Sequence, residues 1–114
     1  MGLRQERLAD EIRDIIASLF TGGTLNDPRI QDVTVTAAKV SPDLQVATIY
    51  YRVYGEEVDA SDVQKGMEAA ASFMRKKIGK ALELRRVPDL RFFFDESIDK
   101  AGDIERLLMD LKKS

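Results

Sequence analysis

Lysine and arginine are the residues of this chain that could most readily bind another molecule, and many of them lie in one stretch. Residues 72–91 read "SFMRKKIGKALELRRVPDLR", and from Phe73 to Arg91 seven basic residues stand against two acidic ones, although the whole chain has a net charge of −2. A concentrated positive field attracts anionic partners even when the net charge does not. The candidate contact residues are Arg75, Lys76, Lys77, Lys80, Arg85 and Arg86.

Helical geometry alone leaves two interpretations of this stretch open. Lys76 and Lys80 are predicted to lie opposite the apolar side of a helix, which is also where any solvated helix carries its charges. The sign of the charges favours a contact surface, because Glu83 is the acid on that face and phosphate backbones are bound by point charges and guanidinium groups. A membrane surface is less favoured, because the apolar side of the helix is needed to cover a sheet.

Aromatic residues offer a second way to hold nucleic acid. Tyr50, Tyr54 and Phe93 are each candidates for stacking on a base, and each is equally compatible with packing inside the protein.

Other kinds of chemistry find little support. The chain has no cysteine and no histidine, which removes disulfides, thiolate nucleophiles, Ser-His or Cys-His catalysis and nearly every zinc or haem site. The "IGK" of residues 78–80 lacks the first glycine of a phosphate loop, since Met74 stands there, and Ala81 replaces the following serine or threonine. We therefore expect no enzyme and no cofactor.

An acidic cluster after the last predicted strand is the remaining candidate. Asp95, Glu96 and Asp99 have the ligand type that magnesium prefers, but carboxylates at such positions more often cap the next helix or face water. We expect no metal.

The length of 114 residues suits a single domain spanning 1–114, with a core of about 4–99. The charged N-terminal segment lacks the apolar run of a secretory signal, and no stretch reaches membrane-spanning length, so a cytoplasmic location is expected.

The apolar spacing predicts the elements that position these residues. A helix is expected over Leu3–Phe20, ending before Gly22 and Gly23. Two strands are expected to form a hairpin, over Val33–Val40 and Gln45–Gly55. In the first of them Val33, Val35 and Ala37 are predicted to share one side of the sheet.

The second half is predicted to contain helix, helix and strand. A helix capped by Asp59 or Ser61 is expected to reach about Leu84, and the small residues around Ala70 indicate a kink where two helices meet. A third strand is expected after Pro88, and a short tail helix over 103–111. Helices on one face of a small sheet give an α+β domain.

These motifs together resemble the ribosome-binding factor A family. The similarity rests on "DPRI" (27–30), "VTVTAAKVSPDLQVATIYYRVYG" (33–55) and "FMRKKIGKALELRRVPDLRFFFDESID" (73–99), and extends over about Arg4 to Leu108. It implies a KH type II-like fold with the order α-β-β-α-(kink)-α-β. It further implies a monomeric assembly factor that binds the free small (30S) ribosomal subunit and its 16S rRNA, with no membrane or small-molecule partner. The role implied is late maturation and 5′-end processing of the rRNA, including in the cold.

The resemblance also assigns residues, with one departure. The family's Ala-x-Gly kink corresponds to Ala70, Ala71 and Ser72, so serine replaces the glycine. The chain has no Gly-x-x-Gly, so clamping of single-stranded nucleotides on such a loop is not supported. Arg29 of "DPR" is either an RNA contact or a salt-bridge partner.

Two functions of other classes remain open at this point. One is a protein-interaction adaptor that uses the sheet or the acidic segment Glu56–Asp62, and the other is a magnesium-dependent enzyme built on the acidic cluster.

Overall fold

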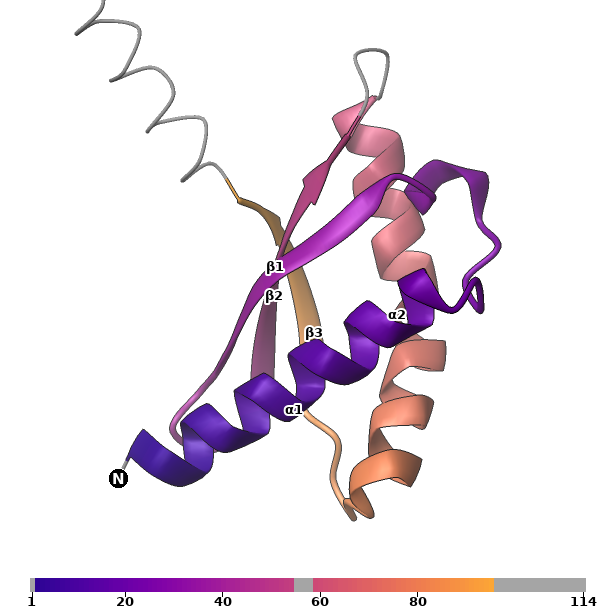
Figure 1. The fold of residues 1–114 in the computed structure, drawn as a ribbon. Helices are drawn as coiled ribbons and strands as arrows, with labels where there is room; N and C mark the ends of the chain where they lie inside the picture. The colour runs from indigo at the N-terminus through magenta and orange to yellow at the C-terminus, as the bar shows by residue number, and fades with distance from the viewer. Residues whose placement is uncertain (1, 55–58, 96–114) are drawn as a thin grey trace, which may run out of the picture.

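Two helices cover one face of a three-stranded sheet in the computed structural model, which describes residues 2–54 and 59–95 (Figure 1). The elements in chain order are α1 (Gly2–Thr21), the 3-10 helix η1 (Pro28–Ile30), β1 (Val33–Val40), β2 (Val46–Val53), α2 (Ala60–Leu82) and β3 (Asp89–Phe94). The sheet order is β1-β2-β3, with β1 antiparallel and β3 parallel to β2. The predicted α+β, KH-like architecture is confirmed, and the predicted tail helix lies outside the described residues.

Helix α1 forms where the apolar spacing predicts it. Ile12 and Ile16 are fully buried, and their spacing of four places them on one side of the helix. The helix ends at Thr21, and Gly23 follows with a φ of +69°, a conformation that glycine adopts without steric cost.

The β1–β2 hairpin contains a bulge that the sequence did not reveal. Val35 pairs with Tyr51, but Ala37 pairs with Tyr50, so Thr36 is an extra residue in β1. Because side chains alternate along a strand, the extra residue moves Ala37 to the opposite side from Val35. The prediction that Val33, Val35 and Ala37 share one side is therefore wrong for Ala37.

Helix α2 begins and ends at identifiable caps. The Asp59 side chain accepts hydrogen bonds from the backbone N–H groups of Ser61, at 2.8 Å, and Asp62. At the other end Glu83 takes the left-handed conformation, with φ of +53°, and its N–H donates to the carbonyl of Gly79. The helix therefore ends at Leu82, two residues earlier than predicted.

One helix stands where the sequence predicts two. The backbone stays α-helical through Ala70, Ala71 and Ser72, because each of these residues carries a normal backbone N–H and no proline or glycine interrupts the hydrogen-bond ladder there. The expectation of two separate helices is corrected, whereas a change of direction within the continuous helix stays a prediction.

The core lies between the helices and the inner face of the sheet. Its fully buried side chains come from every layer: Ile12, Ile16, Ile30, Ile49, Val63, Met67, Met74 and Ile78. The Tyr51 hydroxyl donates to Gln64 Oε1 at 2.7 Å, and Gln64 Nε2 donates to the Phe92 carbonyl at 3.0 Å. This chain of bonds ties α2 to β2 and β3, and burial raises the pKa of the Tyr51 hydroxyl.

Gly66 allows the closest approach of α2 to the rest of the fold. A Cβ at this position would lie 2.6 Å from Ile30 Cγ2 and 3.2 Å from Arg29 Cβ. A side chain would therefore push α2 away from η1, and glycine is needed here for packing.

We expect Gly66→Ala to lower the free energy of unfolding by about 1–3 kcal/mol, the usual cost of overpacking. Glycine to alanine in a helix ordinarily gains up to about 1 kcal/mol, so the sign of the change is informative. Urea unfolding measures it, with Ser72→Ala, at an exposed position of the same helix, as the control. A Gly66→Ala variant as stable as the original chain would contradict the close packing.

Candidate nucleic-acid interface

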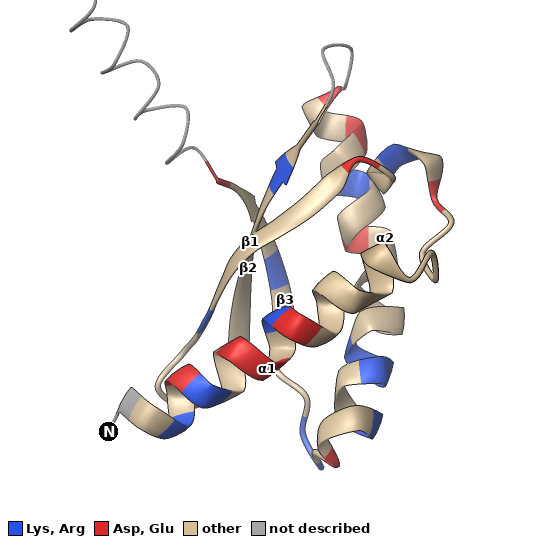
Figure 2. Cartoon of the chain, viewed as in Figure 1, with Lys and Arg blue, Asp and Glu red and all other residues tan. Residues whose placement is uncertain are grey.

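The six candidate contact residues of the stretch 72–91 gather at one end of the domain, along the second half of α2 and in the connection to β3 (Figure 2). Five of them are exposed: Lys76, Lys77, Lys80, Arg85 and Arg86. We call these five residues the basic end. Among residues 2–54 and 59–95, no ion pair to any of the five is present. Lys77 Nζ lies 5.4 Å from the ring centroid of Phe73, and the Lys77 side chain is exposed.

Arg75 differs from its neighbours because it is bound to the protein's own backbone. Its Nη2 donates to the carbonyl of Val87 at 3.0 Å, and its Nε donates to the carbonyl of Pro88 at 3.2 Å. The same Nη2 lies 3.6 Å from Asp89 Oδ1. Arg75 therefore ties α2 to the segment that leads into β3, and in doing so holds the connection that carries Arg85 and Arg86.

A second close approach fixes the same connection. A Cβ at Gly79 would lie 2.8 Å from Val87 Cγ2, and the backbone N–H of Leu84 donates to the Gly79 carbonyl at 3.0 Å. The turn after α2 is thus folded back on the last turns of the helix. Arg85 and Arg86 are thereby carried beside the helical lysines instead of extending away from them.

Between the helix and this connection lies an open hollow of about 380 Å³. Its lining is mostly cationic: Ser72, Arg75, Lys76, Arg85, Arg86 and Val87. A hollow of this kind offers several N–H donors to one anionic group, the arrangement that recognises phosphate.

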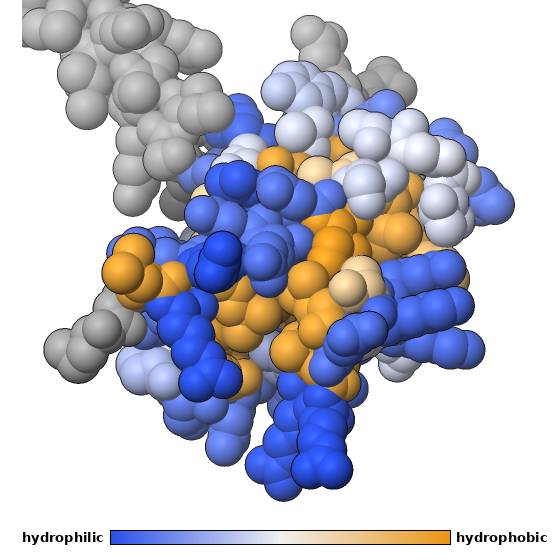
Figure 3. All heavy atoms as spheres, turned by 60° about the horizontal axis from the view of Figure 1, so that its bottom comes forward, coloured by the Kyte–Doolittle hydropathy of each residue, from blue (hydrophilic) through white to orange (hydrophobic). Residues whose placement is uncertain are grey.

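A second hollow, of about 440 Å³, adjoins the first and reaches across to α1 and the β1–β2 turn. Its lining combines apolar residues with charged residues of both signs: Leu8, Leu44, Leu84 and Val87, the basic Arg4, Arg75, Arg85 and Arg86, and the acidic Asp43 and Asp89. The view onto this end of the molecule shows apolar area in the centre, surrounded by hydrophilic residues (Figure 3). Sequence reasoning did not identify Arg4 as part of this surface, because the neighbourhood exists only when α1 lies beside the connection.

Arg29 is not part of the basic end. Its guanidinium forms a two-pronged ion pair with Asp27, with Nη2–Oδ2 at 2.6 Å and Nε–Oδ1 at 3.0 Å. The Arg29 side chain holds the pKa of Asp27 below its usual value, and Asp27 raises the pKa of Arg29 in return. Arg29 packs beside Gly66, ten residues or roughly 15 Å of helix from Lys76.

The acidic candidate is only partly visible. Asp95 Oδ2 accepts a hydrogen bond from the Thr36 hydroxyl at 2.6 Å, which gives this carboxylate a structural partner. Glu96 and Asp99 lie outside the described residues. Within residues 2–54 and 59–95 no group of three possible metal ligands occurs.

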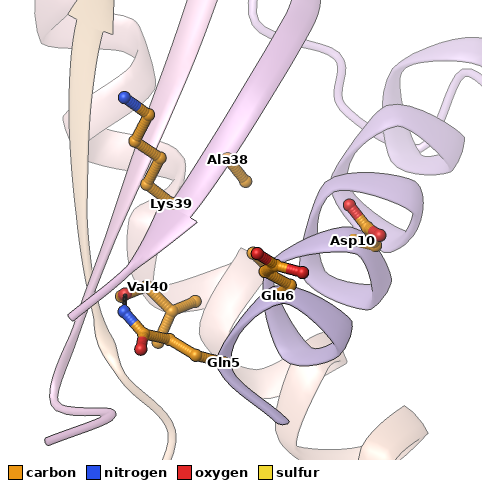
Figure 4. Close-up of a pocket in the computed structure, with 7 residues that line it drawn as sticks. Gln5, Glu6, Asp10, Ala38, Lys39 and Val40 are labelled. Atoms are coloured by element: carbon orange, nitrogen blue, oxygen red, sulfur yellow. Dashed lines mark hydrogen bonds between the residues drawn. The ribbon is translucent and has the colours of Figure 1, made fainter. Parts of the chain in front are cut away.

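A third hollow, of about 310 Å³, separates α1 from β1 (Figure 4). Gln5 crosses it, and its amide donates to the Val40 carbonyl. Glu6 and Asp10 line the helical side, whereas the long side chain of Lys39 points away from them (Figure 4). This hollow has mixed charge and does not extend the basic end. Of the described helices, none is long and apolar enough to cross a membrane.

We expect Arg75→Ala to lower the free energy of unfolding by about 1–3 kcal/mol, because two backbone carbonyls lose a charged donor. Lys76→Ala, one residue along the helix and exposed to solvent, should change it by less than about 0.5 kcal/mol. Urea unfolding of the two variants measures both changes in the free energy of unfolding. Equal effects would contradict a structural role of Arg75.

The ion pair of Asp27 predicts a pH dependence. Because the pKa of Asp27 is lowered in the folded state, its contribution to stability is present above the unfolded value of about 3.9 and is lost as the pH falls through the lowered folded pKa. Asp27→Asn should therefore flatten the dependence of the free energy of unfolding on pH below about pH 4. Urea unfolding at a series of acid pH values measures this slope, and an unchanged slope would contradict the pairing.

Known proteins are similar to this chain in sequence and in fold. A sequence model of the family "Ribosome-binding factor A" matches residues 4–108. Ribosome-binding factor A of Anaeromyxobacter dehalogenans (strain 2CP-C) is 44% identical over 110 residues, which cover 96% of this chain and 79% of that protein.

A crystal structure and a homology model fitted into a cryo-EM map share the fold. The crystal structure of ribosome-binding factor A from Thermus thermophilus has a TM-score of 0.71 at 22% identity, covering 82% of this chain and 97% of that one. A homology model of the Thermus thermophilus protein, fitted into the cryo-EM map of its complex with the 30S subunit, has a TM-score of 0.66 at 23% identity, covering 81% and 96%. With the family match over nearly its whole length, the chain belongs to the ribosome-binding factor A family.

Proposed function

We propose that this chain binds the small ribosomal subunit through its rRNA and acts as a non-catalytic assembly factor. Membership of the family supports the partner, as does the Thermus thermophilus relative that was fitted into a 30S complex. The observation that carries the choice of surface is the basic end, where five exposed cations lie without an acidic partner in the described part of the chain.

The arrangement suits a phosphate backbone. Lysine ammonium groups act as point charges that tolerate variation in geometry, and arginine forks bind phosphate oxygens in pairs. Binding that depends on phosphates and on the shape of folded RNA needs no Gly-x-x-Gly loop, which this chain lacks.

The basic residues divide into contacts and supports in this proposal. Lys76, Lys77 and Lys80 face RNA from the helix, and Arg85 and Arg86 face it from the connection. Arg75 holds that connection in place through the carbonyls of Val87 and Pro88. Arg29 stabilises the loop before β1, since its charge is already paired with Asp27.

The biological role follows from binding one RNA arrangement better than another. A protein that binds the mature arrangement more tightly shifts the population toward it by its difference in affinity, without making or breaking bonds. We infer that the protein acts as a cytoplasmic monomer, without a cofactor, in late maturation and 5′-end processing of 16S rRNA. Support at low temperature belongs to the same inference, because the family resemblance implies it.

We expect binding to free small subunits to weaken steeply with salt. Five phosphate contacts imply a slope of roughly −4 in log affinity against log salt concentration. The double variant Lys76→Glu, Lys80→Glu should bind at least about tenfold more weakly at low salt and show a slope smaller by roughly 2. Co-sedimentation across a salt series measures both quantities.

The control is Lys65→Glu, a charge reversal at an exposed lysine of the same helix outside the basic end. It should bind as the original chain does, and urea unfolding should show all variants equally folded. Binding that is insensitive to salt, or equally affected by both reversals, would contradict the assignment. Such a result would favour the protein-interaction adaptor.

A further inference from the structure

The outer face of the sheet, which α1 and α2 do not cover, carries an ordered pattern of side chains. Two cross-strand rows follow from the register. In one row Lys39 pairs with Thr48 and Thr48 with Arg91, and in the next Ala37 pairs with Tyr50 and Tyr50 with Phe93. The rows are two residues, or roughly 7 Å, apart along the strands. The bulge in β1 completes this pattern, because it moves Lys39 to the outer side, where Tyr50, Arg91 and Phe93 already lie on the other two strands.

The second row presents an aromatic surface to solvent. Phe93 is 52% exposed, and its ring centroid lies 6.3 Å from that of Tyr50, with the ring planes at 37°. The half-buried Tyr50 supports Phe93 from the central strand. Strand alternation turns Phe93 outward between Phe92 and Phe94, and the neighbouring ring of Tyr50 makes a paired aromatic surface that a partner's ring could cover.

The first row supplies positive charge at both edges of the sheet. Lys39 and Arg91 are exposed, and neither forms an ion pair among the described residues. Lys39 Nζ lies 5.7 Å from the Tyr50 centroid, and its side chain points away from Glu6 and Asp10 of α1 (Figure 4). The rows thus place cations beside aromatic rings. The cations can bind the phosphate of a nucleotide, and the rings can stack on its base.

We propose that this outer face binds unpaired nucleotides of RNA, with a base stacked on Phe93 and Tyr50 and phosphates beside Lys39 and Arg91. A single-stranded RNA that crosses the sheet would place its sugar-phosphate backbone along the row of Lys39 and Arg91. Its bases would then stack on the row of Tyr50 and Phe93. The proposal rests on the proposed function for the presence of an RNA partner, but it uses residues that lie outside the basic end.

The pattern favours unpaired RNA over a double helix. A base offers its flat face only when it is not stacked within a duplex, and stacking on aromatic side chains holds any base regardless of sequence. The basic end, which has its charges without such a platform, suits the phosphates of folded RNA. The outer face would therefore bind unpaired nucleotides, and the basic end would bind the phosphates of folded RNA in the same partner.

Tryptophan fluorescence gives a direct test, because the chain has no tryptophan. In the full chain, Phe93→Trp places a single reporter on the outer face, and Leu3→Trp places one at an exposed position at the start of α1. A ten-nucleotide oligouridylate should quench the first reporter and leave the second unchanged. A ten-base-pair RNA duplex should compete at least about tenfold more weakly, since its bases are already stacked.

Two further variants separate stacking from apolar contact and from charge. Phe93→Leu keeps an apolar side chain but removes the ring, and it should weaken binding of labelled oligouridylate about tenfold, the typical value of one stacked base. The double variant Lys39→Glu, Arg91→Glu should weaken it at least as much. Thermal unfolding should show both variants folded.

Quenching of both reporters alike, equal competition by the duplex, or unchanged binding by Phe93→Leu would overturn the proposal. If Phe93→Leu weakens binding to small subunits but not to oligouridylate, the face contacts a ribosomal protein and the proposal is also overturned. Lys76→Glu, Lys80→Glu in the Phe93→Trp chain keeps the quenching if the outer face acts by itself. Failure of the basic end and failure of the outer face are therefore distinguishable.

Discussion

Placement of both described helices on the same face of the sheet is the constraint on which the rest of this structure depends. A three-stranded sheet has two faces, and the helices bury the inner one beneath Ile12, Met67, Met74 and their neighbours. The outer face must then be stable in water while its strands stay paired, which explains its cations and threonine. The same placement leaves the outer side of α2 to solvent. The outer face of the sheet and the basic end are both surfaces that this one-sided packing leaves uncovered.

The end of α2 shows how packing and charge cooperate. The chain turns back after Leu82 because Glu83 accepts a left-handed conformation, Gly79 leaves room for Val87, and Arg75 binds the carbonyls before β3. Arg75 satisfies two backbone carbonyls, whereas the approach of Val87 to Gly79 packs the connection against the helix. Together they carry Arg85 and Arg86 back beside the helical lysines. An acidic protein can thus maintain a strongly positive end, because the acids of α1 and of the first half of α2 lie elsewhere on the domain (Figure 2).

The sequence predicted the elements well because their signals are periodic. The apolar spacing located α1, the limits of β1 agreed with the structure, and the Asp59 cap was one of two candidates. The errors concern features without a periodic signal. The bulge at Thr36 changes which residues face the core, and no local pattern marks it. Arg75 resembled its neighbours in sequence, but its partners are backbone carbonyls that only the folded connection brings near.

The bulge in β1 changes which residues face the core and which face the solvent. Without it Lys39 would keep the inward phase of Val33 and Val35, where a lysine is costly to bury. With it, the inner face receives Val40, which is buried, while Lys39 reaches the rings of the outer face. A single extra residue therefore serves the core and the surface at once. The same shift adds Lys39 to the row of Thr48 and Arg91, beside the aromatic row of Tyr50 and Phe93, so the outer face carries groups that complement the phosphate and the base of a nucleotide.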